Sequence, residues 1–550
     1  MDDHAPSRFA LSRRELLALG GAGLATAAQA RFSPALAQSP KRGGTLSLRL
    51  WDPPHFDPHQ TISYKTHIAY SFTHSRLLKH KAGPAVPPGT FPIEGDLAES
   101  WSQPNEPTYI FKLRKGVRWQ NRPPVNGREL TAEDVVYSVE RFRTLKGNAN
   151  AYMLSSIDKV EAIDKHTIKF TLKEPYVWFL DMIANSHAVP IIAKECVEKF
   201  GDLKKPESMV GSGPWMLDSY RPNVGYIFVR NPGYFLSGLP YIERIEVAVD
   251  EDNASRMAAF IAGKYDMGWE YQGVINRVDW VQIKDTLKQK RPRLQTAEYP
   301  NSVMSHIYMR TDKPPFSDIR VRRAMSLAIN RPGIIDAVYE GVGALNPPVP
   351  AALKEWSVPM DQLGEGGRWY KYDLAQAKKL MAEAGYPNGF SATMEFTTYG
   401  SQVLIDMTQL VLKGLKDIGI DTKLNTKEYG AYIATTFYGK FDSMAFGPQT
   451  GFQEPDNFLY GQYYPGELKN QSHINDPIVA DMLVRQRRTQ DVAKRREVIH
   501  EIQRYLAKQQ YYVQMPSAIQ VAVWEGALKN YATNVSYDYG GRLLAAWLDR

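Results

Sequence analysis

Cysteine is nearly absent from this chain of 550 residues, which contains only Cys196. A single thiol cannot form a disulfide within the chain, and it cannot supply the cysteines of a structural zinc site. Because no cysteine follows the apolar segment near the N-terminus, the sequence also predicts no lipid anchor of the bacterial lipoprotein type. We expect Cys196 to be a half-buried helix residue without a catalytic role.

Long apolar runs are also missing. Beyond the N-terminal region, no unbroken apolar run approaches the roughly 20 residues of a membrane-spanning helix. Hydrophobic residues make up 43% and charged residues 23% of the chain, which at this length is typical of a globular protein with two or three domains. The formal charge is +8, but basic residues are scattered among acids, and the densest groups fall in a polar helical pattern between Arg485 and Arg496. We therefore expect no nucleic-acid partner.

Motifs of the common enzyme classes are absent as well. The sequence contains no His-Glu-x-x-His, no Gly-x-Ser-x-Gly, no Walker loop and no dinucleotide fingerprint placed between a strand and a helix. Gly211-Ser-Gly-Pro-Trp215 is a tight turn, but no Lys-Ser/Thr pair follows that would bind phosphate. Glycosidases need two acids at no fixed spacing, so a hydrolase stays open as an alternative. The sequence predicts a protein that is not an enzyme and holds no cofactor.

Histidines are concentrated in one region, where a metal site has to be considered. Histidine is the commonest metal ligand, but Pro54 and Pro58 exclude a regular helix between the first two of these histidines. No carboxylate or cysteine completes a ligand set there. We expect no metal site and leave the role of these residues open. They are His55, His59, His67, His74 and His80.

The first 37 residues have the layout of an export signal. Arg13-Arg14 precede a modestly apolar stretch that reaches Ala30, which is typical of the twin-arginine route. Small residues at Ala28 and Ala30, and again at Ala35 and Ala37, fit a cleavage site, and we favour cleavage after Ala37. The alternative is an uncleaved N-terminal anchor. This layout predicts a periplasmic protein.

A strand, a turn and a capped helix are predicted between residues 96 and 143. Polar and β-forming residues alternate over 109–114, as in a half-buried strand. Thr131 stands at an N-cap position with Asp134 three residues later, a weaker form of the capping box. The helix that follows has an apolar face at helical spacing. That face consists of Val135, Val136, Val139 and Phe142.

Helices and strands alternate along much of the remaining sequence. Alternating leucines predict a strand within residues 41–50, and residues 160–172 predict a hairpin. A helix is expected to begin after Asp373 and to end at Gly385. Residues 477–509 predict one long polar helix, which a strand at 511–516 follows. Repeated helix–strand units indicate an α/β fold.

The order of these segments resembles a known protein family. The similarity is carried by residues 96–143, by Gly43-Gly-Thr-Leu46 with the Asp-Pro turn after it, by Gly213-Pro-Trp215 and by residues 316–331, FSDIRVRRAMSLAINR. They are similar to the periplasmic solute-binding proteins of ABC importers, in the extracytoplasmic family 5 that takes up peptides, opines, nickel chelates and some sugars. The resemblance implies a two-lobed α/β periplasmic-binding-protein fold. The fold would be type II-like, in its large form, with a hinge between the lobes.

The resemblance also implies a domain organisation and a role. Residues 38–301 and 511–550 would form lobe I, with an extra subdomain at about 76–195, and residues 302–510 would form lobe II. A cleft between the lobes would capture a small solute that is oligopeptide-like, opine-like or sugar-like. The closed protein, acting as a monomer, would then deliver the solute to the ABC permease in the inner membrane. The alternatives are a secreted hydrolase on a similar scaffold and a binding protein that reports to a chemoreceptor.

Three segments supply candidate ligand-binding residues. In the family, the segment after the Asp-Pro turn lines the cleft, and here that segment is 60–66. An aromatic pair flanks a carboxylate at 269–271, and residues 446–458 surround an acid-Pro pair. The candidates are Tyr64, Trp269, Tyr271, Phe446, Gln449, Phe452 and Gln453.

The last of these segments bears on the type of solute. In peptide-binding relatives, an aspartate just before the acid-Pro pair binds the α-amino group of the ligand. Alignment on Glu454-Pro455 puts Gly451 near that place, so the carboxylate is missing. A desolvated ammonium group needs a charge partner. The sequence therefore favours a neutral polar, sugar-like or anionic solute over a peptide with a free amine.

Overall fold

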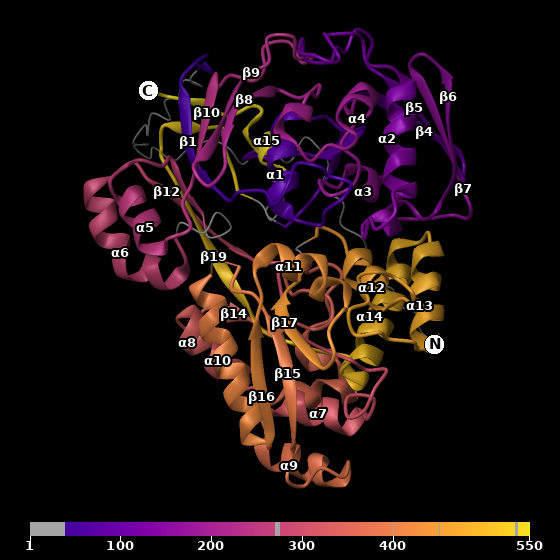
Figure 1. Cartoon of the computed structure of the whole chain (residues 1–550), viewed down its shortest axis with the longest axis vertical. Helices are drawn as coiled ribbons and strands as arrows, with labels where there is room; N and C mark the ends of the chain where they lie inside the picture. The colour runs from indigo at the N-terminus through magenta and orange to yellow at the C-terminus, as the bar shows by residue number, and fades with distance from the viewer. Residues whose placement is uncertain (1–38, 88, 270–274, 400, 450–451, 534–536) are drawn as a thin grey trace, which may run out of the picture. The chain divides into compact units, whose positions relative to one another are not determined.

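Alternating helices and strands run through the described part of the chain, which comprises residues 39–87, 89–269, 275–399, 401–449, 452–533 and 537–550 of the computed structural model (Figure 1). The segment Lys41–Arg550 packs as one unit. The expected export signal, residues 1–37, lies outside the described residues, and so does Tyr271. No helix in the described part is long and apolar enough to cross a lipid bilayer.

Two four-stranded sheets and the helices around them form the part that we call the first lobe. The first sheet has the order β1-β10-β9-β8, in which β1 and β10 are parallel and the other neighbours antiparallel. Alternate leucines of β1, Leu46 and Leu48, are fully buried, as the sequence pattern predicts. The strands of this sheet are β1 (Thr45–Leu50), β8 (Trp215–Arg221), β9 (Gly225–Arg230) and β10 (Arg244–Val249).

The second sheet of the first lobe falls in the region expected as an extra subdomain. It is antiparallel throughout, with the order β4-β5-β7-β6. Helix α2 (Ala132–Thr144) packs against β6 and β7, and the carboxylate of Asp134 accepts a hydrogen bond of 2.9 Å from the backbone N–H of Thr131. The predicted strand, turn and capped helix are thus confirmed. The strands are β4 (Ala98–Asn105), β5 (Thr108–Leu113), β6 (Ile157–Asp164) and β7 (Thr167–Leu172).

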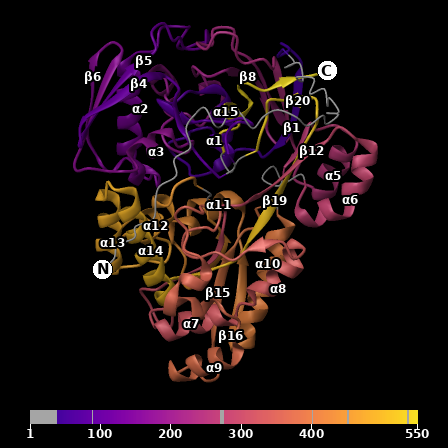
Figure 2. The same cartoon turned by 180° about the vertical axis from the view of Figure 1, so that it is seen from behind.

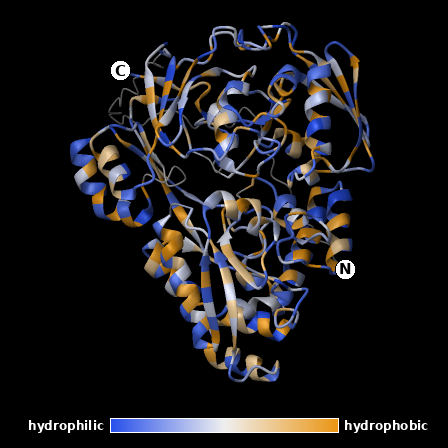
Figure 3. Cartoon of the chain, viewed as in Figure 1, coloured by the Kyte–Doolittle hydropathy of each residue, from blue (hydrophilic) through white to orange (hydrophobic). Residues whose placement is uncertain are grey.

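A five-stranded sheet and its flanking helices form the part that we call the second lobe. The strand order is β16-β15-β17-β13-β18, with β15 parallel to both neighbours and β13 antiparallel to both of its own. The sheet is built of β13 (Ser305–Met309), β15 (Phe390–Phe396), β16 (Ile420–Thr426), β17 (Met444–Pro448) and β18 (Tyr512–Gln514). Helix α10 (Gln402–Asp417) buries Leu404, Met407, Val411 and Leu415 against it, and Figure 3 shows apolar and polar residues alternating along this helix.

Two neighbouring antiparallel strands connect the lobes. Strand β12 (Gln295–Pro300) leads into the second lobe, and β19 (Ser517–Trp524) returns beside it, with Tyr299 opposite Gln520 (Figures 1 and 2). Strand β19 also pairs with β11 (Met267–Trp269) and, at its beginning, with β14 (Gly343–Ala344). One strand therefore carries backbone hydrogen bonds to elements of both lobes.

The remaining elements are helices and two short strand pairs. The helices of the first lobe are α1 (Tyr64–Thr73), α3 (Phe179–Ala184), α4 (Lys194–Phe200), α5 (Asn253–Ile261), α6 (Arg277–Lys290) and α15 (Tyr539–Leu543). Those that follow β13 are α7 (Ile319–Ala328), α8 (Arg331–Tyr339), α9 (Leu374–Glu383), α11 (Tyr429–Ala434), α12 (Asp456–Tyr463), α13 (Pro477–Arg488) and α14 (Val492–Gln509). The strand pairs are β2 (Leu78–His80) with β3 (Ile93–Gly95), and β20 (Leu528–Lys529) with β21 (Trp547–Leu548).

The structure differs from the sequence prediction in three places. Residues 477–509 form two helices, because the carboxylate of Asp491 accepts from the backbone N–H of Lys494 and caps a new helix, α14. The strand after α14 was expected to return to the first lobe, but Tyr512–Gln514 pairs with β13 in the second lobe, and the return is made by β19. Cys196 is buried rather than half-buried, because α4 packs its thiol into the core of the first lobe. The full lobe boundaries stay a prediction.

A buried ion pair joins helices α12 and α13 within the second lobe, and two side chains of the first lobe hydrogen-bond to this cluster. The guanidinium group of Arg487 donates to the carboxylate of Asp456 at 2.8 to 3.1 Å, and both side chains are nearly inaccessible. The phenol of Tyr176, from the segment before α3, donates to the same carboxylate at 2.7 Å. Trp178 donates to Gln486 at 2.8 Å beside it. This contact joins the lobes at a place separate from the two crossing strands.

We expect the substitution Asp456→Asn to destabilise the protein by about 3–5 kcal/mol, because it leaves the charge of Arg487 buried without a counter-charge. The free energy of unfolding in urea measures the effect. Glu501→Gln is the matched control, since it removes the carboxylate that pairs with Arg485 of the same helix α13 on the exposed surface. Equal losses for the two variants would contradict the role given to the buried pair.

The same cluster predicts a pH dependence. Burial, with the negative charge of Asp456 beside it, raises the pKa of Glu454 to about 8. The folded protein then holds a proton that the unfolded chain loses above its ordinary pKa, so the contribution of Glu454 to stability falls as the pH rises toward 8. Glu454→Gln should raise the thermal midpoint more at pH 8 than at pH 5.5. A gain of the same size at both values would show that Glu454 ionises at its ordinary pKa.

Candidate functional site

A cavity of about 220 Å³ lies beside the crossing strands, and both lobes line it. The first lobe contributes Trp51, the start of α1, and residues at the starts of α5 and α6. The second lobe contributes the start of α10, helix α11 and the end of β17. The crossing segments add Asn301, Val303, Pro516, Ala518 and Gln520. The wall of this cavity is thus shared by both lobes and by the segments that connect them.

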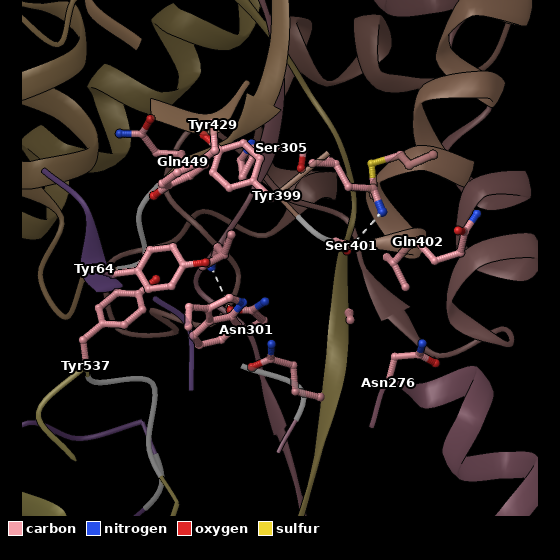
Figure 4. Close-up of a pocket in the computed structure, with 18 of the residues that line it drawn as sticks. Tyr64, Asn276, Asn301, Ser305, Tyr399, Ser401, Gln402, Tyr429, Gln449 and Tyr537 are labelled. Carbon is pink, nitrogen blue, oxygen red and sulfur yellow. Dashed lines mark hydrogen bonds between the residues drawn. The ribbon is translucent and has the colours of Figure 1, made fainter. Parts of the chain in front are cut away.

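Tyrosine rings form much of the wall. Tyr64 stacks on Tyr537, with the two ring centroids 5.2 Å apart. Trp51 meets the ring of Tyr64 edge to face, also at 5.2 Å. Tyr399 and Tyr429 meet edge to face at 5.3 Å, and Figure 4 shows both tyrosine pairs at the cavity. Such rings can cover the apolar face of a ligand while their hydroxyl groups bind its polar edge.

Several buried polar atoms of this wall make no hydrogen bond with the part of the chain that the structure describes. They are the hydroxyl of Tyr399, the amide nitrogen of Gln449, the amide oxygen of Gln520 and the Nε of Arg256. Buried polar atoms of folded proteins are nearly always hydrogen-bonded. Other such atoms of the described residues lie elsewhere in the protein, but these four share one cavity, where a single polar ligand can pair with them. Tyr399 also has a φ of 53°, a left-handed conformation that is uncommon for a bulky side chain and is often found at functional sites.

The charge of the described lining is positive. Among the described lining residues, Arg256 is the only one that carries a formal charge, and none is a carboxylate. Its guanidinium group donates to the carbonyl oxygens of Asp250 and Glu251 and to the side chain of Asn253, at 3.1 to 3.3 Å. Burial lowers the pKa of Arg256, with the neighbouring acids opposing the shift.

The two lobes touch directly at the edge of the cavity. The hydroxyl of Ser63, just before α1, lies 3.0 Å from the hydroxyl of Tyr429 in α11. The ammonium group of Lys65 lies 4.2 Å from the centre of the same ring. Burial lowers the pKa of Lys65, and the negative charge of Glu251 offsets part of this shift. These contacts connect the start of α1 with α11 across the cavity.

The structure places two of the seven predicted ligand residues, Tyr64 and Gln449, in the wall of this cavity. Phe446 lies in β17 but faces the core of the second lobe, because it pairs with Ile307 there. Phe452 packs on His187 and Lys469, and Gln453 is buried; neither is among the described lining residues.

The segment 269–271 is described only at its beginning. Trp269 is the last residue of β11, and its backbone pairs with Ala522 of β19. Glu270, Tyr271 and Gly451 lie outside the described residues. The assignment of ligand-binding residues stays a prediction.

Sequence reasoning missed several residues of the wall. Tyr399, Tyr429 and Tyr537 come from three distant loops or helix starts, and Asn301 and Gln520 come from the crossing strands. A weak signal was present, since Tyr399 and Tyr429 each precede a glycine, which is common where a loop exposes an aromatic side chain. Nothing local to the sequence marks Asn301 or Gln520.

The histidines between residues 55 and 80 lie away from the cavity wall, inside the first lobe. Burial lowers the pKa of His59 and His74 to about 3 and that of His67 and His80 to about 4, so these four are neutral near pH 7. Over the described ranges, no three histidine, cysteine or acidic side chains come together as a metal site would require.

The unpaired hydroxyl of Tyr399 gives a test of the cavity. Tyr399→Phe should raise the free energy of unfolding by up to about 1–3 kcal/mol, because it removes a buried hydroxyl for which the described residues provide no partner. Tyr432→Phe, in the neighbouring helix turn, should lower it by about 0.5–1.5 kcal/mol, because its hydroxyl donates to the carbonyl of Phe446 at 3.1 Å. A loss at Tyr399 as large as that at Tyr432 would show that its hydroxyl is already bonded within the protein.

Comparisons with known proteins agree with this architecture. Residues 92–470, well over half of the chain, match the family described as bacterial extracellular solute-binding proteins, family 5 Middle. Heme-binding protein A of Haemophilus influenzae is 28% identical over 414 residues, 70% of this chain and 70% of the relative.

Two solved structures share the fold over most of the chain. The periplasmic binding protein DppA from Helicobacter pylori, in complex with the peptide STSA, superposes with a TM-score of 0.79 at 25% identity, over 93% of this chain and 99% of that one. MoaA from A. tumefaciens R10, in complex with mannopinic acid, gives 0.77 at 25% identity, over 93% and 100%. These relatives are binding proteins rather than enzymes. The chain belongs to family 5 of the bacterial extracellular solute-binding proteins and has the two-lobed α/β fold of that family.

Proposed function

We propose that this protein is the periplasmic solute-binding component of an ABC importer. It captures one small polar solute in the cavity between its lobes and delivers it unchanged to the permease of the inner membrane. The observation that carries this proposal is the group of unpaired polar atoms that both lobes and the crossing strands point at one cavity. Membership of the solute-binding family supports the same role.

The crossing strands are proposed as the hinge. Only β12 and β19 run from lobe to lobe next to the cavity, among the described strands, so bending there moves Tyr64 relative to Tyr399 and Tyr429. In the closed arrangement, the contact between Ser63 and Tyr429 and the hydrogen bond from Tyr176 to Asp456 hold the lobes together. The closed surface is what a permease would recognise. We propose further that residues 1–37 export the protein by the twin-arginine route.

The chemistry of the wall favours a solute without a free ammonium group. A buried ammonium group requires a carboxylate or a set of acceptors, and the described lining offers no carboxylate. Stacking tyrosines with amide side chains suit an opine-like or sugar-like solute. Of the structural relatives, one was solved with a peptide and another with mannopinic acid, so the family accommodates both types. The proposed solute is of the second type.

Calorimetry with matched ligands tests this choice. Unmodified dipeptides such as Ala-Ala should not bind with nanomolar affinity, since their α-amino groups would be buried against a wall without a described counter-charge. The control is the same dipeptide with an acetylated amine. Nanomolar binding of the free-amine form, together with weaker binding of the acetylated form, would contradict the proposed solute class.

A second measurement separates binding from hydrolysis. Any solute that stabilises the protein against heat should be recovered chemically intact after unfolding, even after hours of incubation. Accumulation of cleavage products in proportion to protein concentration would instead favour the secreted hydrolase.

A further inference from the structure

Four helices begin at the cavity. The starts of α1 at Tyr64, α5 at Asn253, α6 just after Asn276 and α10 at Gln402 all contribute lining residues, and each helix has nine or more residues. Figure 4 shows Tyr64, Asn276 and Gln402 around the same space. The N-terminus of a helix carries roughly half a positive charge, from N–H groups that have no partner within the helix. The convergence of four such ends makes the potential of the cavity more positive than Arg256 alone would.

Helix α1 differs from the other three in its cap. Side chains of Asp252, Asn276 and Ser401 accept hydrogen bonds from the first turns of α5, α6 and α10. No side chain caps α1, because the hydroxyl of Ser63 lies 3.0 Å from that of Tyr429 instead. The backbone N–H of Thr66 already donates to the carbonyl of Ser63. Within the described residues, the start of α1 therefore leaves only the N–H groups of Tyr64 and Lys65 without an acceptor.

Three buried cations lie in or directly beside the wall of this cavity. Arg256 lines the cavity, Arg49 lies 5.0 Å from the ring centre of Trp51, and Lys65 lies 4.2 Å from that of Tyr429. Each of the three side chains is at most 9% exposed. Burial lowers the pKa of Arg49, and the positive charge of Arg256 lowers it further. Burial also lowers the pKa of Lys65, and the charge of Arg49 adds to that shift. Such a grouping of like charges is unfavourable unless an anion accompanies it.

The acids near these cations are half-buried or exposed, and one of the half-buried ones, Asp279 in the first turn of α6, acts on Arg256. Glu251 is 3.6 Å from Arg49 but its side chain is 52% exposed, and Asp250 and Asp252 belong to the same loop. Asp52 binds Tyr220 and Asn223, and Glu428 caps α11. These acids are at most half-buried, whereas all three cations are buried. Water and salt therefore screen the acids more than the cations, and the acids compensate the field inside the cavity only in part.

We propose that the solute of this cavity is an acid, whose carboxylate is received at the first-lobe wall by the Nε of Arg256 and the uncapped start of α1. This inference rests on the proposed function and specifies its solute. Arg256 supplies a buried donor without a partner, and the start of α1 supplies backbone N–H groups. Lys65 strengthens the binding by its charge without touching the solute. The tyrosines and the amides of Gln449 and Gln520 then bind the uncharged remainder of the molecule.

An unbiased ligand fractionation tests the proposal with the complete protein. A small-molecule extract of bacterial culture is passed over an anion exchanger at pH 7, and the retained and unretained fractions are each tested for a rise in thermal midpoint. The retained, anionic fraction should stabilise the protein, and the unretained fraction should not. Stabilisation by the unretained fraction alone would overturn the acidic solute while leaving the proposed function intact. Stabilisation by neither fraction would count against the proposed function itself and against this inference with it.

Charge variants provide the matched control. Lys65→Gln should weaken binding of the retained fraction by about threefold to tenfold at low salt, with the difference shrinking at high salt as the charge is screened. Lys378→Gln removes the same charge from the exposed surface of α9 and should leave binding unchanged. Equal effects of the two variants, or a Lys65→Gln effect that salt does not change, would contradict the proposal.

Discussion

Polar groups that are removed from water need partners, and this constraint explains more of the structure than any single contact does. At the cavity, Tyr399, Gln449, Gln520 and Arg256 each bury an atom whose hydrogen bond is unmade. An atom of this kind costs about 1–3 kcal/mol. Buried atoms without a described partner also occur elsewhere in the protein, such as those of His306 and Gln471, but at the cavity a polar solute can supply the missing partner. Binding and lobe closure then share one cause, since the unpaired atoms come from both lobes and from the strands between them.

The same rule, with the opposite outcome, governs the second contact between the lobes. There, the carboxylate of Asp456 is paired with Arg487 inside the second lobe, and it also accepts a hydrogen bond from Tyr176 of the first lobe. An arrangement that separates the lobes there would leave the buried hydroxyl of Tyr176 without this acceptor. The lobes thus meet at one site that is complete within the protein and at another that is incomplete. Under the proposed function, the first site would fix how the lobes meet and the solute would supply the hydrogen bonds missing at the second.

Local patterns were sufficient to predict the elements and the fold class, because those depend on neighbours in the sequence. The leucines of β1, the cap at Thr131 and Asp134, and the helix after Asp373 all follow from periodicity and capping. The two-lobed fold came from the similarity of whole segments to a family. The partner strand of Tyr512–Gln514 could not be predicted, because β-pairing is set by contacts between distant residues. The split of the long helix at Asp491 was visible in the sequence as a capping residue and was overlooked.

The cavity was predicted less well, for a physical reason. Tyr64 and Gln449 were found through the family resemblance, whereas Phe446 was placed in the cavity although its strand turns it into the core. A strand reverses its side chains at every residue, so an error of one position exchanges cavity and core. Tyr399, Tyr429 and Tyr537 become one wall only after folding, and no local pattern connects them.

The central claim is that the cavity holds one small polar molecule and releases it unchanged. Native mass spectrometry of the protein purified from its own periplasm tests this claim most directly. The account predicts a complex heavier than the protein by the mass of a single small molecule, which appears intact when the protein is unfolded. Protein that carries no such mass under any growth condition, or that yields only fragments of the molecule, would contradict it.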